Sequence, residues 1–293
     1  CRDWSSDVCS SDLCLNQTYS AIELLVVDGG STDQTLEIIQ SYQDERMRLI
    51  HQPQNAGKLP GAINLGLEQA RGEYLTWMQA DSIYALNAIE TMVNALEEYP
   101  DIGQVYADFW VIDEQGLRIR IHETRDPEKI LFRPQKADEL LGVLGDPGGV
   151  CFLLRREVRD LIGIHDVDAY PVHDYDYRLR IAMHCPSLRL KVPLYEWRLH
   201  PDSLTGSRPW IVDPQHDLRI RMKLGLCSKQ QAEQTRGELF VAYAFDCYQK
   251  RIWDEVPKFV LSGIRRSPRH VFNRGVWAIL LKSLIYRNRD GKN

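Results

Sequence analysis

Early in the chain, the hydrophobic positions alternate between the pattern of a buried strand and that of an amphipathic helix. Residues 24–27 form a continuous branched apolar run, LLVV, which is typical of a strand buried on both faces. Residues 47–51 and 73–78 predict two more strands, and residues 33–44 and 62–71 predict the helices between them. This alternation predicts an α/β fold with a mixed, mainly parallel sheet flanked by helices.

The alternation continues and then ends near residue 211. The further expected elements are a helix at 86–99, a hairpin at 105–112 and 117–122, a short helix near 137–144, a strand at 151–154, a helix at 174–183 and a strand at 188–199. Beyond them only the helical period remains, and the helices expected there cover 214–224, 229–251, 255–266 and 269–286. The pattern therefore predicts an α/β domain over residues 14–210 and a helical C-terminal extension over residues 211–293.

Residues 1–13, CRDWSSDVCSSDL, follow neither pattern. They contain a near repeat and no initiator Met. We interpret them as a non-native segment in place of the natural N terminus. A domain of this class normally begins with a strand, and because none is visible before residue 23, the first strand is predicted to be missing.

Composition and charge argue against several classes of function. The chain carries 36 basic and 41 acidic residues, a net charge of −5 and a pI near 5.9, which argues against a nucleic-acid partner. Seven cysteines without a CxxC pair indicate reduced thiols, so a cytoplasmic location is expected. No apolar run reaches the roughly 18 residues that a membrane-spanning helix needs.

The last helical segment, VFNRGVWAILLKSLIYRNR, combines apolar and basic residues. Val276, Trp277 and Leu280 stand beside Arg274 and Lys282. Such a pattern predicts either an interfacial helix that contacts a membrane peripherally or, more commonly, a helix that docks on the rest of the protein.

Candidate chemistry begins at the end of the first visible strand. Asp28 stands where this strand ends, and α/β sheets bind ligands at that edge. Gly29 and Gly30 permit positive φ and a close approach of the backbone to a ligand. The alternative is that Asp28 and Asp33 only accept hydrogen bonds from the turn and from the start of the next helix.

A second group of polar residues follows the strand at 73–78. Gln79 and Asp81 come at its carboxyl end and are expected at the same sheet edge as Asp28. An acidic run, HDYDY, begins the helix predicted at 174–183. Polar residues from distant parts of the chain are thus expected around one crevice.

Five motifs carry a resemblance to a known family. They are VVDGGSTD, NAGKLPGAINLG, GEYLTWMQADS, GGVCFLLRREV and HDYDYRLRIA. In this order and spacing, over residues 15–205, the chain resembles the family 2 glycosyltransferases with a GT-A fold. The resemblance implies inverting transfer of a sugar from a nucleotide-activated donor, a UDP-sugar above all, to an acceptor hydroxyl, with Mg²⁺ or Mn²⁺ as cofactor. It also implies a glycan or lipid-linked acceptor in surface polysaccharide biosynthesis.

The resemblance assigns four residues to donor binding. Asp28 is similar to the family's aspartate that accepts hydrogen bonds from the nucleotide base, and Gly30 belongs to the same turn. Lys58 would pair with a donor phosphate, the alternative being a solvated side chain. Gln79 takes the first position of the family's DxD motif and would bind a ribose hydroxyl.

The resemblance assigns three residues to the chemistry. Asp81, the last position of the DxD motif, would bind the metal, and His200 would complete the metal shell or else be a surface histidine. Asp174 stands where the family has its catalytic aspartate and would be the general base, with helix capping as the alternative. Asp176, two residues later, is better explained as a cap or as the partner of an arginine.

Other classes of function remain to be weighed. A binding protein of the same fold, without turnover, is favoured by Gly29 and Gln79 in place of acids and by the missing strand. The chain would then be a nucleotide-sugar-binding protein or a truncated, inactive fragment. An NAD-dependent dehydrogenase is disfavoured because no GxGxxG follows the first visible strand. Two-metal nucleotidyl transfer would require more acids around Asp81.

Overall fold

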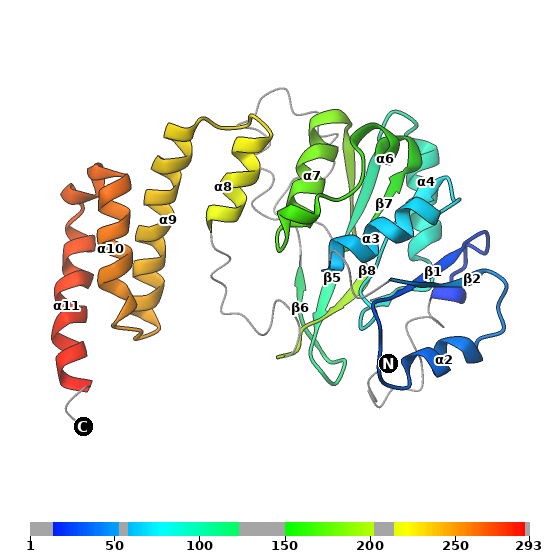
Figure 1. Ribbon diagram of the computed structural model, residues 1–293, viewed down its shortest axis with the longest axis horizontal. Helices are drawn as coiled ribbons and strands as arrows, with labels where there is room; N and C mark the ends of the chain where they lie inside the picture. The colour runs from blue at the N-terminus through cyan, green and yellow to red at the C-terminus, as the bar shows by residue number, and fades with distance from the viewer. Residues whose placement is uncertain (1–13, 53–57, 123–149, 202–213, 291–293) are drawn as a thin grey trace. The chain divides into compact units, whose positions relative to one another are not determined.

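The computed structural model describes residues 14–52, 58–122, 150–201 and 214–290 (Figure 1). The chain divides into two compact units, Cys1–Trp210 and Ile211–Asn293. The boundary lies where the sequence changes to helical periods alone. The segment at 1–13 and the short helix expected near 137–144 lie outside the described residues.

The first unit alternates strands and helices along its length. Its elements are β1 (Leu24–Asp28), α2 (Thr35–Ser41), β2 (Met47–His51), α3 (Lys58–Gln69), β3 (Tyr74–Leu75), β4 (Ile83–Tyr84), α4 (Ala88–Glu98), β5 (Gln104–Ile112), β6 (Arg118–His122), β7 (Phe152–Arg155), α6 (Arg156–Ile162), η2 (Val167–Ala169), α7 (His173–His184) and β8 (Ser187–Arg198). The predicted mixed α/β architecture is confirmed.

The described strands pair in both directions, as expected for a mixed sheet. β1 pairs with β2 and β5 with β8 in parallel, whereas β3–β7, β5–β7, β4–β8 and β5–β6 are antiparallel. The six-stranded sheet has the order β3-β7-β5-β8-β4, with β6 beside β5. The β5–β6 turn shows why that pair is antiparallel: Asp113 Oδ1 accepts the Gln115 and Leu117 N–H groups, and Gly116 takes a φ of +82°. A tight turn can join only antiparallel neighbours.

Strand β1 is less buried than its apolar sequence predicts. Leu24 to Val27 are half-buried, and only Asp28 at the end of the strand is buried. In the described part of the sheet β1 pairs with β2 alone, so that its other edge carries no strand there. Helix α3 packs on β1, since a Cβ at Gly66 would stand 3.5 Å from Val27 Cγ2.

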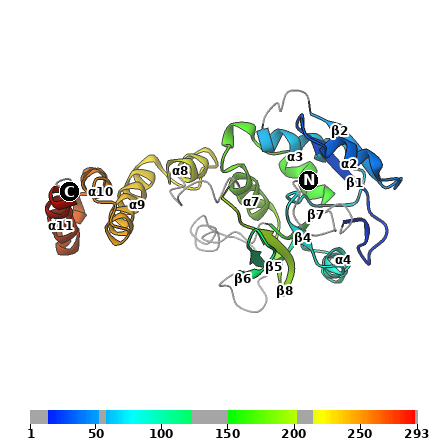
Figure 2. The same ribbon diagram turned by 90° about the horizontal axis from the view of Figure 1, so that it is seen from below.

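The six-stranded sheet has a helix-covered core on each face. On one face, Val105 and Ala107 of β5 pack with Met92 of α4. On the other face, Tyr106 packs with Tyr177 and other residues of α7. Figure 2 shows α4 and α7 on opposite sides of β5 and β8. Because side chains alternate along a strand, β5 places successive residues in these two cores.

Three local predictions differ from the structure. The strand expected at 73–78 is limited to Tyr74–Leu75, after which the chain turns and returns as β4. Helix α3 begins at Lys58, earlier than expected, and α6 was not predicted. Such short elements follow tertiary pairing rather than a local period.

A buried ion pair joins β5 and β8 inside the sheet. Arg189 Nη2 donates to both carboxylate oxygens of Asp108, at 2.7 and 2.9 Å, and Arg189 Nε donates to Oδ1 at 3.0 Å. Both residues are buried. The β5–β8 register shifts at Asp108, which accommodates the pair within the parallel ladder.

We expect Arg189→Met to lower the free energy of unfolding by about 3–5 kcal/mol, because it leaves the Asp108 carboxylate buried without its partner. Urea denaturation measures the change. Arg118→Met is the matched control: it removes an exposed Arg118–Glu196 pair of the same length, 2.7 Å, and should cost at most about 1 kcal/mol. Equal losses in the two variants would contradict the expectation.

The second unit consists of helices. They are α8 (Pro214–Lys223), α9 (Lys229–Gln249), α10 (Glu255–Arg266), η3 (Pro268–Phe272) and α11 (Arg274–Asp290). A capping box at Ser228 and Gln231 begins α9. The single helix expected at 269–286 is broken at Asn273, whose Oδ1 accepts the Gly275 N–H and so starts α11. α9, α10 and α11 enclose an apolar core that includes Val241, Val260 and Val276. In the described chain, no helix is long and apolar enough to cross a membrane.

Candidate active site

Asp28 ends β1 and closes the turn that follows. Its carboxylate accepts the Gly30 N–H at 3.0 Å, the Ser31 N–H at 3.1 Å and the Ser31 hydroxyl. The Ser31 hydroxyl lowers the Asp28 pKa most; burial opposes it, and the two N–H groups lower the pKa further. Gly30 has a φ of +98°, so the turn uses the freedom predicted for it. Asp28 is therefore held ionised at the strand end.

The alternative for Asp28 is that it only accepts hydrogen bonds from the turn and from the start of the next helix. That alternative accounts for every hydrogen bond that Asp28 makes here. Asp33 behaves in the same way, since its Oδ1 accepts the Thr35 N–H at 3.0 Å. An ionised carboxylate offers about four acceptor sites, so these bonds leave Asp28 able to accept one more donor. The assignment to a nucleotide base stays a prediction.

Asp81 and His200 meet across 119 positions of the sequence. Asp81 Oδ2 lies 3.2 Å from His200 Nε2, and Asp81 Oδ1 accepts the Ser82 hydroxyl at 3.3 Å. Both side chains are partly exposed. Among the described residues, no group of three or more His, Cys, Asp or Glu side chains could hold a metal ion. The pair thus offers one oxygen and one nitrogen ligand, and the remaining ligands would have to come from a bound phosphate and water.

A buried arginine, missed by the sequence reading, fixes the turn that carries Asp81. Arg198 is buried at the end of β8, and its Nε donates to the Asp81 carbonyl at 2.9 Å. Its Nη1 donates to the carbonyls of Asp113 and Glu114, each at 3.0 Å. Trp197, one residue earlier, donates its indole N–H to Gln79 Oε1 at 2.8 Å. The end of β8 therefore positions both Gln79 and Asp81, just before His200.

Asp174 is the second residue of α7 and does not cap the helix through its N-cap position. Its carboxylate is half-exposed, accepts the Tyr175 N–H at 2.8 Å and pairs with Arg178 at 3.1 Å. It lines a small pocket together with Trp77 and Tyr177. Desolvation raises its pKa, but the Arg178 charge, His173 and the Tyr175 N–H outweigh this effect and lower the pKa below its usual value. The carboxylate is therefore ionised at neutral pH.

Two buried histidines adjoin Asp174. Burial lowers the pKa of His165 to about 3 and also lowers that of His173, so both are neutral at neutral pH. Arg178 is then the permanent charge beside Asp174. The His165 ring stacks on Tyr177, with ring centroids 4.0 Å apart, and meets Trp77 edge to face at 4.7 Å.

Helix α3 is tied to this cluster by Asn64. Its amide donates to the His165 carbonyl at 2.8 Å and accepts the His165 N–H at 2.7 Å, and both bonds are buried. Sequence reasoning did not single out Asn64, His165 or Trp77. A small polar residue on the apolar face of a predicted helix was the only signal that could have identified Asn64.

Lys58 does not lie in the loop that the sequence predicted for it. It is the first residue of α3, with a φ of +55°, and its ammonium lies 4.5 Å from the centroid of the Tyr170 ring. Tyr170 in turn stacks on His173, beside Asp174. The structure thus brings Lys58 toward the start of α7.

The predicted site residues form three groups. Asp28 and Gly30 share one turn, Gln79, Asp81 and His200 lie around the end of β8, and Lys58 approaches the start of α7 near Asp174. Within the described chain, no hydrogen bond or ion pair joins Asp28, Asp81 and Asp174 to one another.

We expect Arg178→Gln to raise the Asp174 pKa, because the charge that favours the ionised form is lost. Because the Asp174 pKa is lower in the folded protein than in the unfolded one, the ionised carboxylate stabilises the fold at pH values above the unfolded-state pKa. This stabilisation is lost as the pH falls through the folded-state pKa. Carboxyl chemical shifts followed against pH measure the change. Lys250→Gln, which removes another (i, i+4) pair, with Asp246, is the matched control and should leave the Asp174 titration where it is.

Residues 12–163 match the model for glycosyl transferase family 2, and the chain belongs to this family. The match covers more than half of the chain. Asp28, Lys58, Gln79 and Asp81 fall within it. Asp174 and His200 lie beyond it, so their roles depend on the motif resemblance and on the geometry.

Two bacterial relatives match parts of the chain. An uncharacterized glycosyltransferase of Haemophilus influenzae is 34% identical over 113 residues, which cover 38% of this chain and 44% of that protein. Glycosyltransferase GlyG of Streptococcus pneumoniae is 40% identical over 102 residues, which cover 34% of this chain and 33% of that protein. The matched part is thus less than half of either relative.

Solved structures share the fold at low sequence identity. S. aureus TarS 1–349 in complex with UDP-GlcNAc has a TM-score of 0.60 and 15% identity, covering 93% of this chain and 84% of that chain. Mannosyltransferase PcManGT from Pyrobaculum calidifontis, in complex with GDP-Man and Mn²⁺, has a TM-score of 0.52 and 19% identity, covering 75% of this chain and 60% of that chain. The expected GT-A fold is confirmed.

Proposed function

We propose that this protein transfers a sugar, with inversion, from a nucleoside diphosphate sugar to an acceptor hydroxyl. The observation that carries the proposal is the meeting of Asp81 and His200, because a carboxylate and an imidazole brought together across 119 positions form the start of a metal site that the family motif assigns to the donor. The complexes of TarS with UDP-GlcNAc and of PcManGT with GDP-Man support a nucleotide-sugar donor, and we propose a UDP-sugar.

Asp174 is proposed as the general base. Its half-exposed carboxylate is ionised and lines a small pocket, so it can accept the proton of an acceptor hydroxyl as that oxygen attacks the sugar. A single base without a covalent glycosyl-enzyme inverts the configuration of the sugar carbon. Arg178 keeps the carboxylate ionised and orients it through the 3.1 Å contact.

Asp81 and His200 are proposed to hold a divalent cation, Mg²⁺ or Mn²⁺. An oxygen and an imidazole nitrogen are compatible with Mn²⁺, whereas Mg²⁺ prefers oxygen ligands. The bound ion would neutralise charge on the departing nucleoside diphosphate. Arg198 and Trp197 hold the Asp81 turn in place for this role.

The remaining residues are proposed to bind the donor. Asp28 accepts a hydrogen bond from the nucleotide base, and Gly30 lets the turn approach it. Lys58, at the start of α3, reaches a phosphate by leaving the Tyr170 ring, with the helix N-terminus adding favourable potential. Gln79, whose Oε1 is engaged by Trp197, offers its amide N–H to a ribose hydroxyl.

We also propose a cytoplasmic role in surface polysaccharide or glycan synthesis, with a glycan or lipid-linked acceptor. A lipid-linked acceptor would place the reaction at a membrane surface.

A second candidate is donor binding without turnover. Asp174 is paired with Arg178, and its lowered pKa makes it a weaker base than an unpaired aspartate. The neutral Gln79 also withholds one carboxylate from the metal.

Release of nucleotide from UDP-GlcNAc, other UDP-sugars and GDP-mannose, with and without Mn²⁺, tests the two candidates. A transferase is expected to show Mn²⁺-dependent release that an acceptor accelerates. A rise in melting temperature with UDP and Mn²⁺ but no release from any donor would instead establish the binding function.

A further inference from the structure

Helix α11 is apolar on two faces. Its inner face, Val276, Ile279, Leu280 and Ser283, is buried against the core of the second unit. Its outer face, which we define as Trp277, Leu281, Leu284 and Ile285, is exposed by 40, 60, 42 and 55%. These four positions follow the i, i+4, i+7, i+8 spacing of one helix stripe. A helix that buries one apolar face and exposes another carries a surface for a second partner.

The apolar surface continues into the residues before α11. Phe272 in η3 is 88% exposed, more than any other large hydrophobic residue in the described chain. Trp277 donates its indole N–H to the Val271 carbonyl at 2.7 Å, which fixes the ring beside η3. The indole donor is thus satisfied inside the unit, and the ring can lie against an apolar phase at no cost in lost hydrogen bonds.

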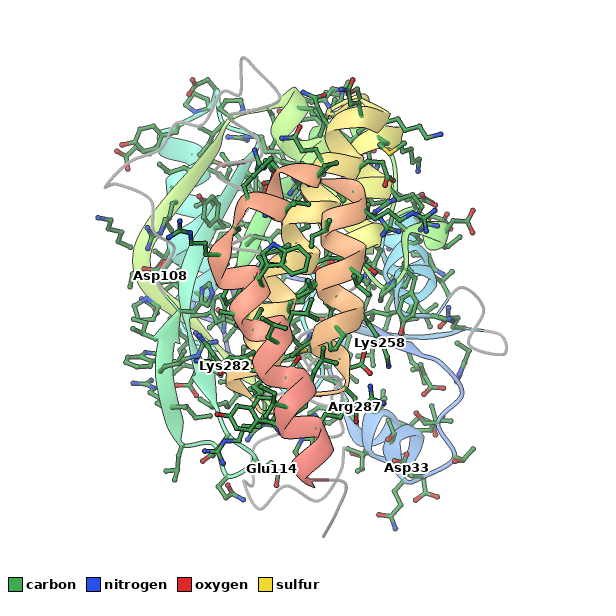
Figure 3. All side chains as sticks on the ribbon, turned by 90° about the vertical axis from the view of Figure 1, so that its left-hand side faces the viewer. Asp33, Asp108, Glu114, Lys258, Lys282 and Arg287 are labelled. Carbon is green, nitrogen blue, oxygen red and sulfur yellow. The ribbon has the colours of Figure 1, made fainter. Side chains whose placement is uncertain are left out.

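The sequence that forms α10, η3 and α11 is rich in basic residues. Residues 256–289 contain eight basic residues and no acidic one, in a chain whose net charge is −5. They are Lys258, Arg265, Arg266, Arg269, Arg274, Lys282, Arg287 and Arg289. Figure 3 looks onto this side of the second unit and labels Lys258, Lys282 and Arg287.

Part of this charge is already neutralised within the unit. Arg266 and Arg269 pair with Glu233 and Glu238 of α9, Arg287 pairs with Asp254, and Lys258 pairs with Glu255. Arg265, Arg274 and Lys282 are exposed, and no acidic partner contacts them within the described part of the chain. Arg274 and Lys282 flank the outer face of α11 on the same helix. The positive charge available to a partner is therefore concentrated at the edge of the apolar stripe.

We propose that the outer face of α11, together with Phe272, docks on the surface of an anionic lipid bilayer. The apolar side chains enter the boundary between headgroups and acyl chains, and Arg274 and Lys282 contact anionic headgroups. The helix lies in the plane of the interface, because it is not long and apolar enough to cross it. A second copy of the chain fits this face less well, since pairing two such faces brings the basic residues of both copies together.

The proposal extends the proposed function by placing it on a lipid surface, but it is tested separately. The full chain is mixed with vesicles of phosphatidylcholine alone and of phosphatidylcholine with phosphatidylglycerol, and bound protein is measured by flotation. Binding is expected only to the anionic vesicles and is expected to fall with added salt. Leu281→Glu with Ile285→Glu should lower the partition coefficient at least about tenfold. Arg274→Gln with Lys282→Gln should lower it roughly fivefold per charge.

Leu161→Glu is the matched control, since Leu161 is a 64% exposed leucine on helix α6 of the first unit. Its vesicle binding should equal that of the unchanged chain. Circular dichroism and melting temperature show whether each variant folds. If Leu281→Glu with Ile285→Glu does not fold, Arg274→Gln with Lys282→Gln tests the proposal by itself. Nucleotide release from a soluble donor should be unchanged in both α11 variants, which separates a failure of docking from a failure of the transferase.

Three outcomes would overturn the proposal. The first is equal binding to neutral and anionic vesicles, and the second is binding that neither α11 variant reduces. The third is a dimer in light scattering that Leu281→Glu with Ile285→Glu dissociates, without binding to any vesicle, since the outer face would then pair with a second copy.

Discussion

Asp174→Asn is expected to lower kcat for sugar transfer by about 10²–10⁴-fold, because an amide cannot accept the proton of the attacking hydroxyl. The half-exposed position of the side chain makes the exchange of carboxylate for amide sterically mild. KM for the donor should change little, and the melting-temperature rise on adding UDP with Mn²⁺ should persist. Steady-state rates with a donor and its acceptor measure the effect.

The pH dependence of the same reaction is expected to follow from the lowered pKa of Asp174. A base is active when deprotonated, so kcat/KM should stay level as the pH falls below neutral and decline only when the pH drops through the lowered pKa. Asp160→Asn is the matched control, because Asp160 is an exposed acid on α6 that also contacts an arginine, Arg159. A kcat equal in the Asp174 and Asp160 variants would remove the base assignment.

Asp81→Asn is expected to raise the Mn²⁺ concentration needed for half-maximal activity by about 100-fold or more, and His200→Ala by about tenfold, because each removes one of the two proposed protein ligands. Chelation of the metal should abolish nucleotide release, and added Mn²⁺ should restore it. A titration of activity with Mn²⁺ measures both shifts.

Asp33→Asn serves as the control for this metal prediction, since Asp33 is an exposed acid that only caps a turn through Thr35 (Figure 3). Its Mn²⁺ requirement should match that of the unchanged chain. Nucleotide release that continues in a chelator, with no response of Asp81→Asn to Mn²⁺, would show that this pair holds no catalytic ion.

Much of the fold follows from local pattern. The apolar run at 24–27 became β1, the amphipathic run at 86–99 became α4, and the helix that begins in HDYDY became α7. Each of these elements is long enough to show the hydrophobic periodicity of its type of secondary structure. The strand expected at 73–78 is only Tyr74–Leu75, because β7 pairs with these two residues alone. Sequence periodicity carries no information on how far such a pairing with a distant segment extends.

The candidate site divides in the same way. The sequence motifs pointed to Asp28, Asp81 and Asp174 as candidates, since Asp28 ends a strand, Asp81 follows the strand expected at 73–78 and Asp174 lies at a helix start. It did not identify Arg198, whose guanidinium joins the Asp81 turn to the β5–β6 hairpin, or Asn64, which joins α3 to His165. Both side chains form hydrogen bonds with backbone carbonyl or N–H groups of distant segments. Nearly every residue type carries such groups, so the sequence does not indicate which of them a side chain will contact.

The sequence by itself determined the class of fold, the change to helices near residue 211 and the acids placed at strand and helix ends, because hydrophobic period and turn chemistry are local properties. Only the tertiary structure decided that His200 meets Asp81, that Arg198 holds the turn that carries Asp81, and that one apolar face of α11 is buried while a second one is exposed. Contact, burial and electrostatic environment depend on which distant segments pack together. A one-dimensional pattern does not record that packing.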